Sequence, residues 1–286
     1  MMHAICRTFV LGITIGAAAI IGMPGLAQAP ANEKSAGGVL GFDRYHTPEE
    51  LNASVRAINQ TNPGVTAIHS IGRSPGGQEL LVLEIGPRAG GKSRRVPAVF
   101  VVANLEGTLP IASEAAMFLA YRLIEDEEAR KDLGWYLLVS GNPDGARHFF
   151  SRPVFAAGWN EDPRNDDMDD AVDEDGPDDL DGNGIITEMR VKDPGGEWIP
   201  EETDPRLMRR ADPVKGEKGI YKLYTEGIDQ DGDGQYNEDG PGGTDISITF
   251  PHLFKPFTAR GGDWPGSEPE TFAIMKFVME HPEICN

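Results

Sequence analysis

The sequence predicts an α/β fold in which a mixed, largely parallel sheet is flanked by helices. Three features lead to this prediction. Strand-like and helical runs alternate between residues 47 and 139. The runs 96–102 and 135–139 are nearly continuously apolar, which is typical of strands buried on both faces. The segment between them, 111–125, has helical spacing, so the order implies a right-handed crossover between parallel strands.

The elements before this crossover are a helix and a hairpin. Thr47 can cap a helix, the following proline suits the first turn, and Glu50 completes a capping box. Apolar residues then recur at helical spacing until Asn-Pro-Gly at 62–64 ends the helix. The runs 65–71 and 80–85 are strand-like and are joined by a Gly-rich turn, which predicts a hairpin.

The amino terminus has the pattern of a secretory signal. A positively charged start ending at Arg7 is followed by an apolar run over 9–21, and small residues around Ala27 offer a cleavage site. We therefore expect residues 1–27 to be a signal peptide, residues 28–41 a flexible lead, and the mature protein to be secreted or periplasmic. The alternative is an uncleaved membrane anchor, although the run is shorter than the roughly 20 residues that span a bilayer.

The composition bounds the classes of partner. The 286 residues carry a formal net charge of −20, which repels nucleic acid and anionic lipid, so neither is expected as a partner after signal removal. A peptide or protein is the expected partner class, and the sequence does not specify an oligomeric state. Cys285 would be the one cysteine left after signal cleavage, so stability must come from packing or bound ions.

Residues 160–243 lack periodicity and are rich in Asp, Gly, Pro and Asn, which predicts a long acidic loop insertion. Within it, 179–187 and 229–235 follow the start of an EF-hand calcium loop, although neither has the bidentate glutamate of the twelfth position. So many carboxylates repel one another unless a cation neutralises them, which favours structural calcium. The alternative is a solvated, disordered insertion. The predicted calcium ligands are Asp179, Asp181, Asn183, the Ile185 carbonyl, Asp229, Asp231, Asp233 and Gln235.

An apolar helix follows the insertion, where Ser267 and Glu270 can form a capping box. Four groups of motifs then stand in a fixed order along the chain. They are Ser-Ile-Gly-Arg-Ser at 70–74 with the apolar run 80–85, Asn-Pro-Asp-Gly at 142–145, Gly-Thr-Asp-Ile-Ser-Ile-Thr-Phe-Pro-His at 243–252, and Ser-Glu-Pro-Glu-Thr at 267–271.

In order and spacing, these motifs resemble the zinc carboxypeptidase (carboxypeptidase A-like) family, in particular a subgroup with Asp-rich insertions. The resemblance covers nearly all of the mature chain, as a partial carboxypeptidase-like domain over 42–286. It implies a carboxypeptidase-like α/β fold, zinc as the cofactor, and removal of C-terminal amino acids from peptides as the ancestral activity.

The resemblance also implies that zinc is bound by two His and a Glu, the first two from an H-x-x-E motif after the third strand. In the matching stretch, Glu106 stands at the His position and Leu109 at the Glu position. A leucine side chain cannot ligate a metal. The family clamps the substrate carboxylate with D-x-N-R-N-[FW]. Ser247 and Ile248 replace its Asn and Arg, which removes the bidentate contact.

The family's last zinc histidine and catalytic glutamate would fall beyond Asn286, so we expect the domain to be incomplete at its C-terminus. The literal H-x-x-E run at 46–49 straddles a helix start, and we interpret it as unrelated to zinc. His69 is expected to be a satisfied structural histidine, and His281 has no evident partner ligand. We therefore expect a relative that binds no zinc and hydrolyses no peptide. Two alternatives stay open: an active metallocarboxypeptidase with non-standard ligands, and a fragment of a longer peptidase.

Overall fold

The computed structural model describes residues 40–89, 92–93, 96–154, 157–164, 172–173, 176–230, 232, 234, 236–237 and 242–285. The predicted signal peptide and nearly all of the predicted lead lie outside the described residues. So do three of the predicted calcium ligands, Asp231, Asp233 and Gln235. No helix in the described ranges is long and apolar enough to span a lipid bilayer.

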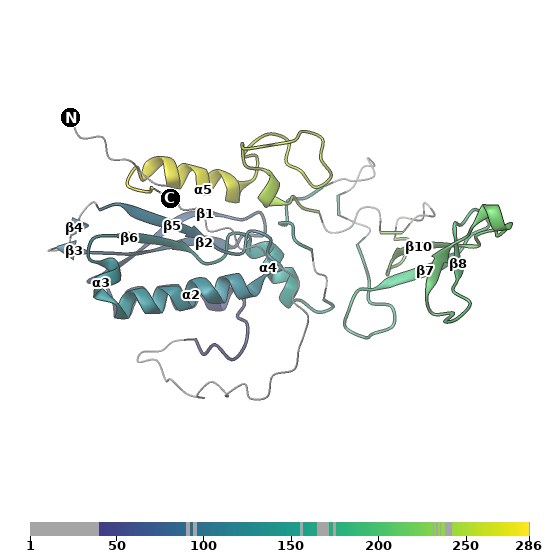
Figure 1. Cartoon of the computed structure of the whole chain (residues 1–286), viewed down its shortest axis with the longest axis horizontal. Helices are drawn as coiled ribbons and strands as arrows, with labels where there is room; N and C mark the ends of the chain where they lie inside the picture. The colour runs from purple at the N-terminus through teal and green to yellow at the C-terminus, as the bar shows by residue number, and fades with distance from the viewer. Residues whose placement is uncertain are drawn as a thin grey trace.

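A four-stranded mixed sheet lies between two layers of helices (Figure 1). Its strands, in spatial order, are β1 (Thr66–Arg73), β2 (Glu79–Ile85), β6 (Gly134–Leu138) and β5 (Ala98–Val102). The pair β5–β6 is parallel, as the crossover predicted, whereas β1–β2 and β2–β6 are antiparallel. The mixed α/β fold is confirmed, but among the described strands the sheet is partly rather than largely parallel.

Helices cover both faces of this sheet (Figure 1). α1 (Pro48–Thr61) and α2 (Pro110–Glu125) pack on one face, and α5 (Pro269–Glu280) covers the other. Apolar side chains from helix and sheet interlock on each face, and each fully buried one stabilises the fold by roughly 1.5–3 kcal/mol. On the α1–α2 face they include Leu51, Val55, Leu83, Met117 and Leu137, and on the α5 face Leu80, Val82, Phe100, Leu138 and Phe277.

The predicted capping box at the start of α1 is confirmed. Glu50 N donates to Thr47 Oγ1 at 3.3 Å, and Thr47 N donates to Glu50 Oε2 at 3.0 Å. The capping box predicted for α5 is wrong. Glu268 is the N-cap residue there, no side chain caps the helix, and the Ser267 hydroxyl donates instead to the Glu268 carboxylate.

The substitution Thr47→Ala is expected to lower the free energy of unfolding by about 1 kcal/mol, because it leaves the amide of Glu50 without its side-chain acceptor. Urea denaturation followed by circular dichroism measures this loss. Thr61→Ala is the matched control, since the Thr61 hydroxyl donates to carbonyls at the other end of the same helix. Equal effects of the two substitutions would contradict the role of Thr47 as a cap.

Short elements complete the description. α3 (Glu127–Arg130) follows α2, and β3 (Arg88–Ala89) pairs with β4 (Lys92–Ser93). The Asn-Pro-Asp-Gly motif after β6 begins the helix α4 (Pro143–Phe150), with Asn142 as its cap.

The insertion holds a second sheet, so the prediction of loop is wrong for residues 188–225. In spatial order the strands are β7 (Glu188–Lys192), β10 (Tyr221–Thr225), β8 (Trp198–Pro200) and β9 (Met208–Arg210), all antiparallel. This sheet lies to one side of the main sheet (Figure 1). Its strands are short and only half-buried, so they carry no continuous apolar run. The 3-10 turn η1 (Pro213–Lys215) lies between β9 and β10. A second 3-10 turn, η2 (Ile246–Ile248), follows the insertion.

Candidate functional site

The positions that the resemblance assigns to zinc lie in the loop between β5 and α2. Asn104 fixes this loop: its backbone is left-handed, with φ of 53°, its amide donates to the Gly107 carbonyl at 3.0 Å, and its Oδ1 accepts from Leu109 N at 3.1 Å. Glu106 is exposed, and Leu109 is 47 % exposed. The loop is therefore ordered by its own hydrogen bonds, and it presents one carboxylate and one apolar side chain to the surface.

This loop packs against the start of α4. A Cβ atom on Gly107 would lie 2.6 Å from backbone atoms of Gly145, and Gly107 has a φ of +66°. Asn142 joins the neighbouring segments, since its Oδ1 accepts from Gly145 N at 2.9 Å and its Nδ2 donates to the Gly158 carbonyl at 3.1 Å. The loops after the parallel strands β5 and β6 thus meet at the carboxyl end of the sheet, where α/β folds commonly bind ligands.

A buried acidic network lies at the same end of the molecule. Asn160 is at its centre: Nδ2 donates to Glu268 Oε2 at 2.9 Å and to Glu270 Oε2 at 3.2 Å, and Oδ1 accepts from Thr244 N at 2.8 Å. Glu270 is fully buried, and its other oxygen, Oε1, has no hydrogen-bond partner among the described residues. Burial, followed by the charges of Asp144 and Glu268, raises the pKa of Glu270 to about 8. This raised pKa favours the neutral carboxylic acid form of Glu270 at pH 7.

Asp144 ties this network to the β1–β2 turn. It is fully buried, and it accepts hydrogen bonds from Ser74 Oγ at 2.6 Å, Gly76 N at 3.0 Å and Glu161 N at 3.3 Å. Glu161 pairs with His148 at 3.2 Å, and the hydrogen bond from His148 is the main cause of the lowered pKa of Glu161. The acids of this network are thus held by neighbouring donors, and no sequence motif predicted a site role for any of them.

The substrate-clamp positions lie on η2, which follows Thr244. Ser247 and Ile248 are both exposed. The Ser247 hydroxyl donates to Asp245 Oδ1 at 2.7 Å, so it is engaged within its own turn. Neither residue carries a cation that could pair with a carboxylate.

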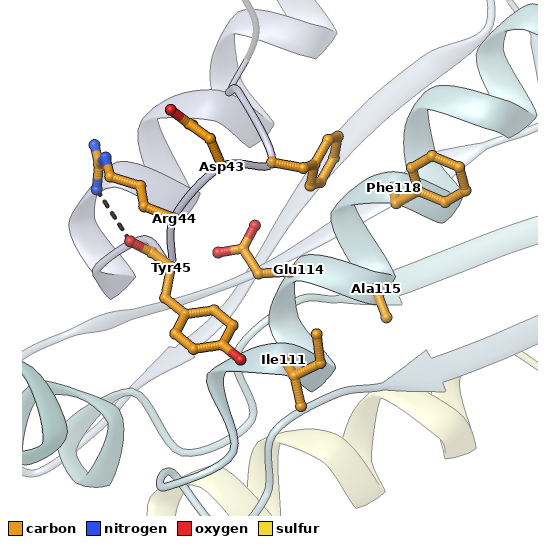
Figure 2. A pocket seen from close by; sticks show the side chains of 8 residues that line it. Asp43, Arg44, Tyr45, Ile111, Glu114, Ala115 and Phe118 are labelled. Atoms are coloured by element: carbon orange, nitrogen blue, oxygen red, sulfur yellow. Dashed lines mark hydrogen bonds between the residues drawn. The ribbon is translucent and has the colours of Figure 1, made fainter. Parts of the chain in front are cut away.

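A pocket of about 520 Å³ opens beside α2, between this helix and residues 42–45 (Figure 2). Phe42 and Phe118 meet edge to face in it, with ring centroids 5.6 Å apart. Glu114 belongs to its lining, but Oε1 of Glu114 accepts from His46 N at 2.8 Å and lies 2.9 Å from His46 Nδ1. The histidine of the literal H-x-x-E run thus pairs with a buried glutamate of α2. This contact attaches the segment before α1 to α2.

The donor set does not fit zinc at the expected position. Leu109 has no atom with a lone pair to donate, and Glu106 supplies a single carboxylate. Within the described ranges, Asp179, Asp181 and Glu226 form a group of acidic residues that could hold a metal ion. Their ligand atoms lie within 4.8 Å of one another. That group is in the insertion and not beside Glu106.

The first calcium-like loop is shaped around Asp179. Its carboxylate accepts from Asn183 N at 3.0 Å and from Gly184 N at 2.7 Å, while Asn183 Oδ1 accepts from Ile185 N at 2.8 Å. Asp181 also accepts from Asn183 N, at 3.0 Å. The structure therefore brings the side chains of Asp179, Asp181 and Asn183 together.

Glu226 is the member of this group that sequence reasoning missed. It follows β10, and it reaches the loop because β10 pairs with β7. Its carboxylate is buried and accepts from Leu180 N at 2.8 Å, Asp181 N at 3.2 Å, Thr187 N at 3.1 Å and Thr187 Oγ1 at 2.7 Å. The hydrogen bonds that Glu226 accepts lower its pKa, and the bond from the Thr187 hydroxyl is the largest cause. No motif marks Glu226, since it is distant in sequence from the loop.

The described part of the second calcium-like loop repeats the first. Asp229 accepts from Gly232 N at 2.6 Å and from Gly234 N at 3.0 Å, as Asp179 accepts from the amides of its own loop. Gly232 and Gly234 have φ of +85° and +94°, and Gly182 and Gly184 have +72° and +84°. At their described positions, the two loops thus have the same glycine conformations and similar hydrogen bonds to the first aspartate.

Comparisons with known proteins agree with this fold and with the ordered motifs. Residues 51–178 match the family described as zinc carboxypeptidase. The chain is 30 % identical to zinc carboxypeptidase A 1 of Drosophila melanogaster over 110 residues, 36 % of this chain and 25 % of that protein. It is 31 % identical to the human carboxypeptidase N catalytic chain over 110 residues, 36 % of this chain and 24 % of the relative.

The match therefore spans about a quarter of the length of these relatives. Among solved structures, carboxypeptidase A from Helicoverpa armigera superposes with a TM-score of 0.55 at 16 % identity, covering 87 % of this chain and 46 % of that one, which shows a shared fold. Sequence and fold agree: residues 51–178 match the zinc carboxypeptidase family, and the fold is shared with a carboxypeptidase.

Proposed function

We propose that this protein is an exported zinc carboxypeptidase relative that binds a peptide or protein without zinc-dependent peptide hydrolysis, and that calcium stabilises its insertion. The observation that carries the proposal is the pair of residues at the expected zinc position. Leu109 offers no ligand atom, and Glu106 stands alone on a loop whose shape Asn104 fixes. The signal-like pattern over residues 1–27 supports export.

The substrate-clamp positions support the same proposal. A working clamp grips a terminal carboxylate through a bidentate arginine, and Ile248 can make no such contact. Ser247 keeps a hydroxyl, but that hydroxyl already donates to Asp245. Any peptide bound at this end of the sheet would therefore be recognised by groups other than the family's clamp.

Zinc titration with a competing chelator tests the proposal. Glu106→Ala is expected to leave zinc affinity unchanged, because Glu106 has no second ligand beside it. The variant E106H/L109E is the positive control: it restores the H-x-x-E donor pair on the same loop, and we expect zinc affinity to rise by at least about tenfold. A loss of zinc affinity in Glu106→Ala would instead favour an active metallocarboxypeptidase with non-standard ligands.

The calcium part of the proposal depends on the group formed by Asp179, Asp181 and Glu226. Calcium takes six to eight oxygen ligands, and carboxylates are prominent among them. Glu226 already accepts four hydrogen bonds, about as many as a carboxylate has lone-pair sites, so we assign it the role of holding the loop. Asp179 and Asp181, with the carbonyl of Ile185, would then face the ion.

Calcium is expected to raise the thermal unfolding temperature of the wild type, because an ion that binds only the folded state adds about 2.7 kcal/mol at 100 times its Kd. Glu226→Gln should reduce calcium affinity by at least about tenfold, since glutamine cannot accept all of the hydrogen bonds that position the loop. Differential scanning fluorimetry with calcium, and with magnesium for comparison, measures both effects.

Glu188→Gln is the matched control, because Glu188 is exposed and lies just after the loop. It removes the same formal charge without removing a loop contact. An unfolding temperature that calcium leaves unchanged in the wild type would contradict the calcium part of the proposal, and so would equal calcium affinities in the two variants.

A further inference from the structure

The pocket between α2 and residues 42–45 combines exposed aromatic rings with a buried carboxylate (Figure 2). Its volume of about 520 Å³ falls within the roughly 300–1,000 Å³ that is typical of small-molecule sites. Glu106 and Leu109, which stand at the expected zinc position, do not belong to its lining. The pocket is therefore a second candidate site, separate from that position.

Glu114 supplies the polar group of this pocket. Its side chain is only 7 % exposed. One carboxylate oxygen, Oε1, accepts from His46 N at 2.8 Å and lies 2.9 Å from His46 Nδ1. The other, Oε2, is buried and has no hydrogen-bond partner among the described residues. An ionised carboxylate only accepts hydrogen bonds, so Oε2 is a buried acceptor that lacks a donor, an arrangement that costs free energy.

Three aromatic side chains line the same pocket. Phe42, Tyr45 and Phe118 are 48 %, 45 % and 54 % exposed. Phe42 meets Phe118 edge to face at 5.6 Å between ring centroids, and it meets Tyr121 in the same way at 5.9 Å, so α2 holds its ring in place. The face of an aromatic ring attracts a cation, and the ring also covers the apolar part of a ligand.

We propose that this pocket binds a primary ammonium group carried on an apolar body, with Glu114 Oε2 accepting a hydrogen bond from the ammonium. An ammonium only donates hydrogen bonds, and its positive charge complements the carboxylate. An uncharged apolar ligand would leave Oε2 without a donor, and an anionic ligand would be repelled. A free arylalkylamine and the N-terminus of a peptide share the required chemistry.

Access to Oε2 depends on the segment before α1. In Figure 2 the Glu114 carboxylate extends from α2 toward residues 43–45. Because Oε2 is buried, the ammonium reaches it when this segment moves outward. Residues 42–45 lie outside helices and strands and are exposed, so such a movement breaks no helix or strand.

The charged groups around the pocket favour a cation. Arg44 belongs to the lining, but its guanidinium donates to Glu50 at 2.8 Å and 2.5 Å and points away from Glu114 in Figure 2. Asp43 is exposed and adds a second negative charge to the lining. Counted together, these groups stay negative even with His46 protonated. The positive end of α2 opposes a cation, but this effect falls off within the first helical turn and Glu114 lies in the second.

Isothermal titration of the full chain with 2-phenylethylamine tests the site, and 2-phenylethanol, which lacks the ammonium, is the matched ligand control. We expect the alcohol to bind at least about tenfold more weakly, and Glu114→Gln to weaken binding of the amine by a similar factor, because each removes one partner of the charged hydrogen bond. Phe118→Ala should weaken binding of the amine about three- to tenfold. Phe272→Ala removes a similarly exposed ring from α5 and should leave it unchanged.

The tripeptide amide Phe-Ala-Ala and its N-acetylated form distinguish the two sources of an ammonium. Binding of both the tripeptide and 2-phenylethylamine would support a site for amines in general. Binding of the tripeptide alone, with loss on acetylation, would support a site for peptide N-termini.

Equal wild-type affinities for 2-phenylethylamine and 2-phenylethanol, with no loss of tripeptide binding on acetylation, would overturn the proposal without any variant. Wild-type affinity in Glu114→Gln would also overturn it, as would failure of both ammonium probes to bind. Phe118→Ala removes a half-exposed ring and no buried group, so an unchanged affinity there would contradict the role of the aromatic wall. The outcome is separable from that of the proposed function, because these variants leave Glu106, Leu109 and both calcium-like loops intact.

Discussion

Replacing Glu270 with glutamine is expected to stabilise the protein at about pH 9 and to leave its stability nearly unchanged at about pH 4. Glu270 is fully buried, and its pKa rises from 4.5 in the unfolded chain to about 8 in the folded protein. Below the unfolded pKa, both states hold the proton and Glu270 has no effect on the pH dependence. Between about 4.5 and 8 the unfolded chain releases the proton while the folded protein retains it, so wild-type stability falls as pH rises.

Above the folded pKa this penalty is complete and constant. A tenfold change in the ionisation constant of an acid corresponds to about 1.4 kcal/mol, so the expected advantage of Glu270→Gln at high pH is on the order of a few kcal/mol. Glutamine keeps the shape of the neutral acid, which removes the titration without opening a cavity. Urea denaturation of both proteins at about pH 4, 6 and 9 measures the difference.

The control for this prediction is Glu127→Gln, which changes an exposed glutamate on α3. Its effect on stability should vary little with pH. If the difference between the wild type and Glu270→Gln were the same at all three pH values, Glu270 would not be a neutral acid in the folded protein.

The substitution Gly107→Ala is expected to destabilise the protein by about 3 kcal/mol or more. Two penalties add at this position. A φ of +66° is unfavourable for alanine, and the new Cβ would lie 2.6 Å from the Gly145 backbone, which cannot move without displacing the start of α4. The contact joins the loops at the carboxyl ends of β5 and β6, so the substitution tests whether the candidate site is packed as described.

Gly216→Ala isolates the backbone part of this effect. Gly216 has a φ of +74°, and no atom lies within 4 Å of the position that a Cβ would take, so it carries the backbone penalty alone, about 1–2 kcal/mol. The difference between the two variants, measured by urea denaturation, gives the cost of the contact with Gly145. Equal losses would show that the two loops are not in close contact.

Local signals predicted the main body of the fold. The capping box at Thr47 and Glu50 and the apolar runs of β5 and β6 are properties of neighbouring residues, and each corresponds to the element found. The capping box at Ser267 failed because the helix begins one residue later, where Glu268 is held by Asn160 instead. Side-chain contacts from distant segments thus decided the details of that helix start.

The features that sequence patterns did not predict depend on contacts between distant segments. The strands β7 and β10 are short and half-exposed, so they carry no strong apolar pattern, although their pairing brings Glu226 to the loop of Asp179. Glu270 resembles a helix-capping residue in the sequence, and only the fold surrounds it with other acids. The ring contact between His281 and His69 likewise exists only in the fold.

The most direct test of the central claim is an assay for release of C-terminal amino acids from a peptide mixture by the purified full chain supplied with zinc, followed by mass spectrometry. We expect no release above that of a chelator-treated sample, because the residues at the expected zinc position supply one carboxylate and a hydrocarbon. Zinc-dependent release that Glu106→Ala abolishes would contradict it.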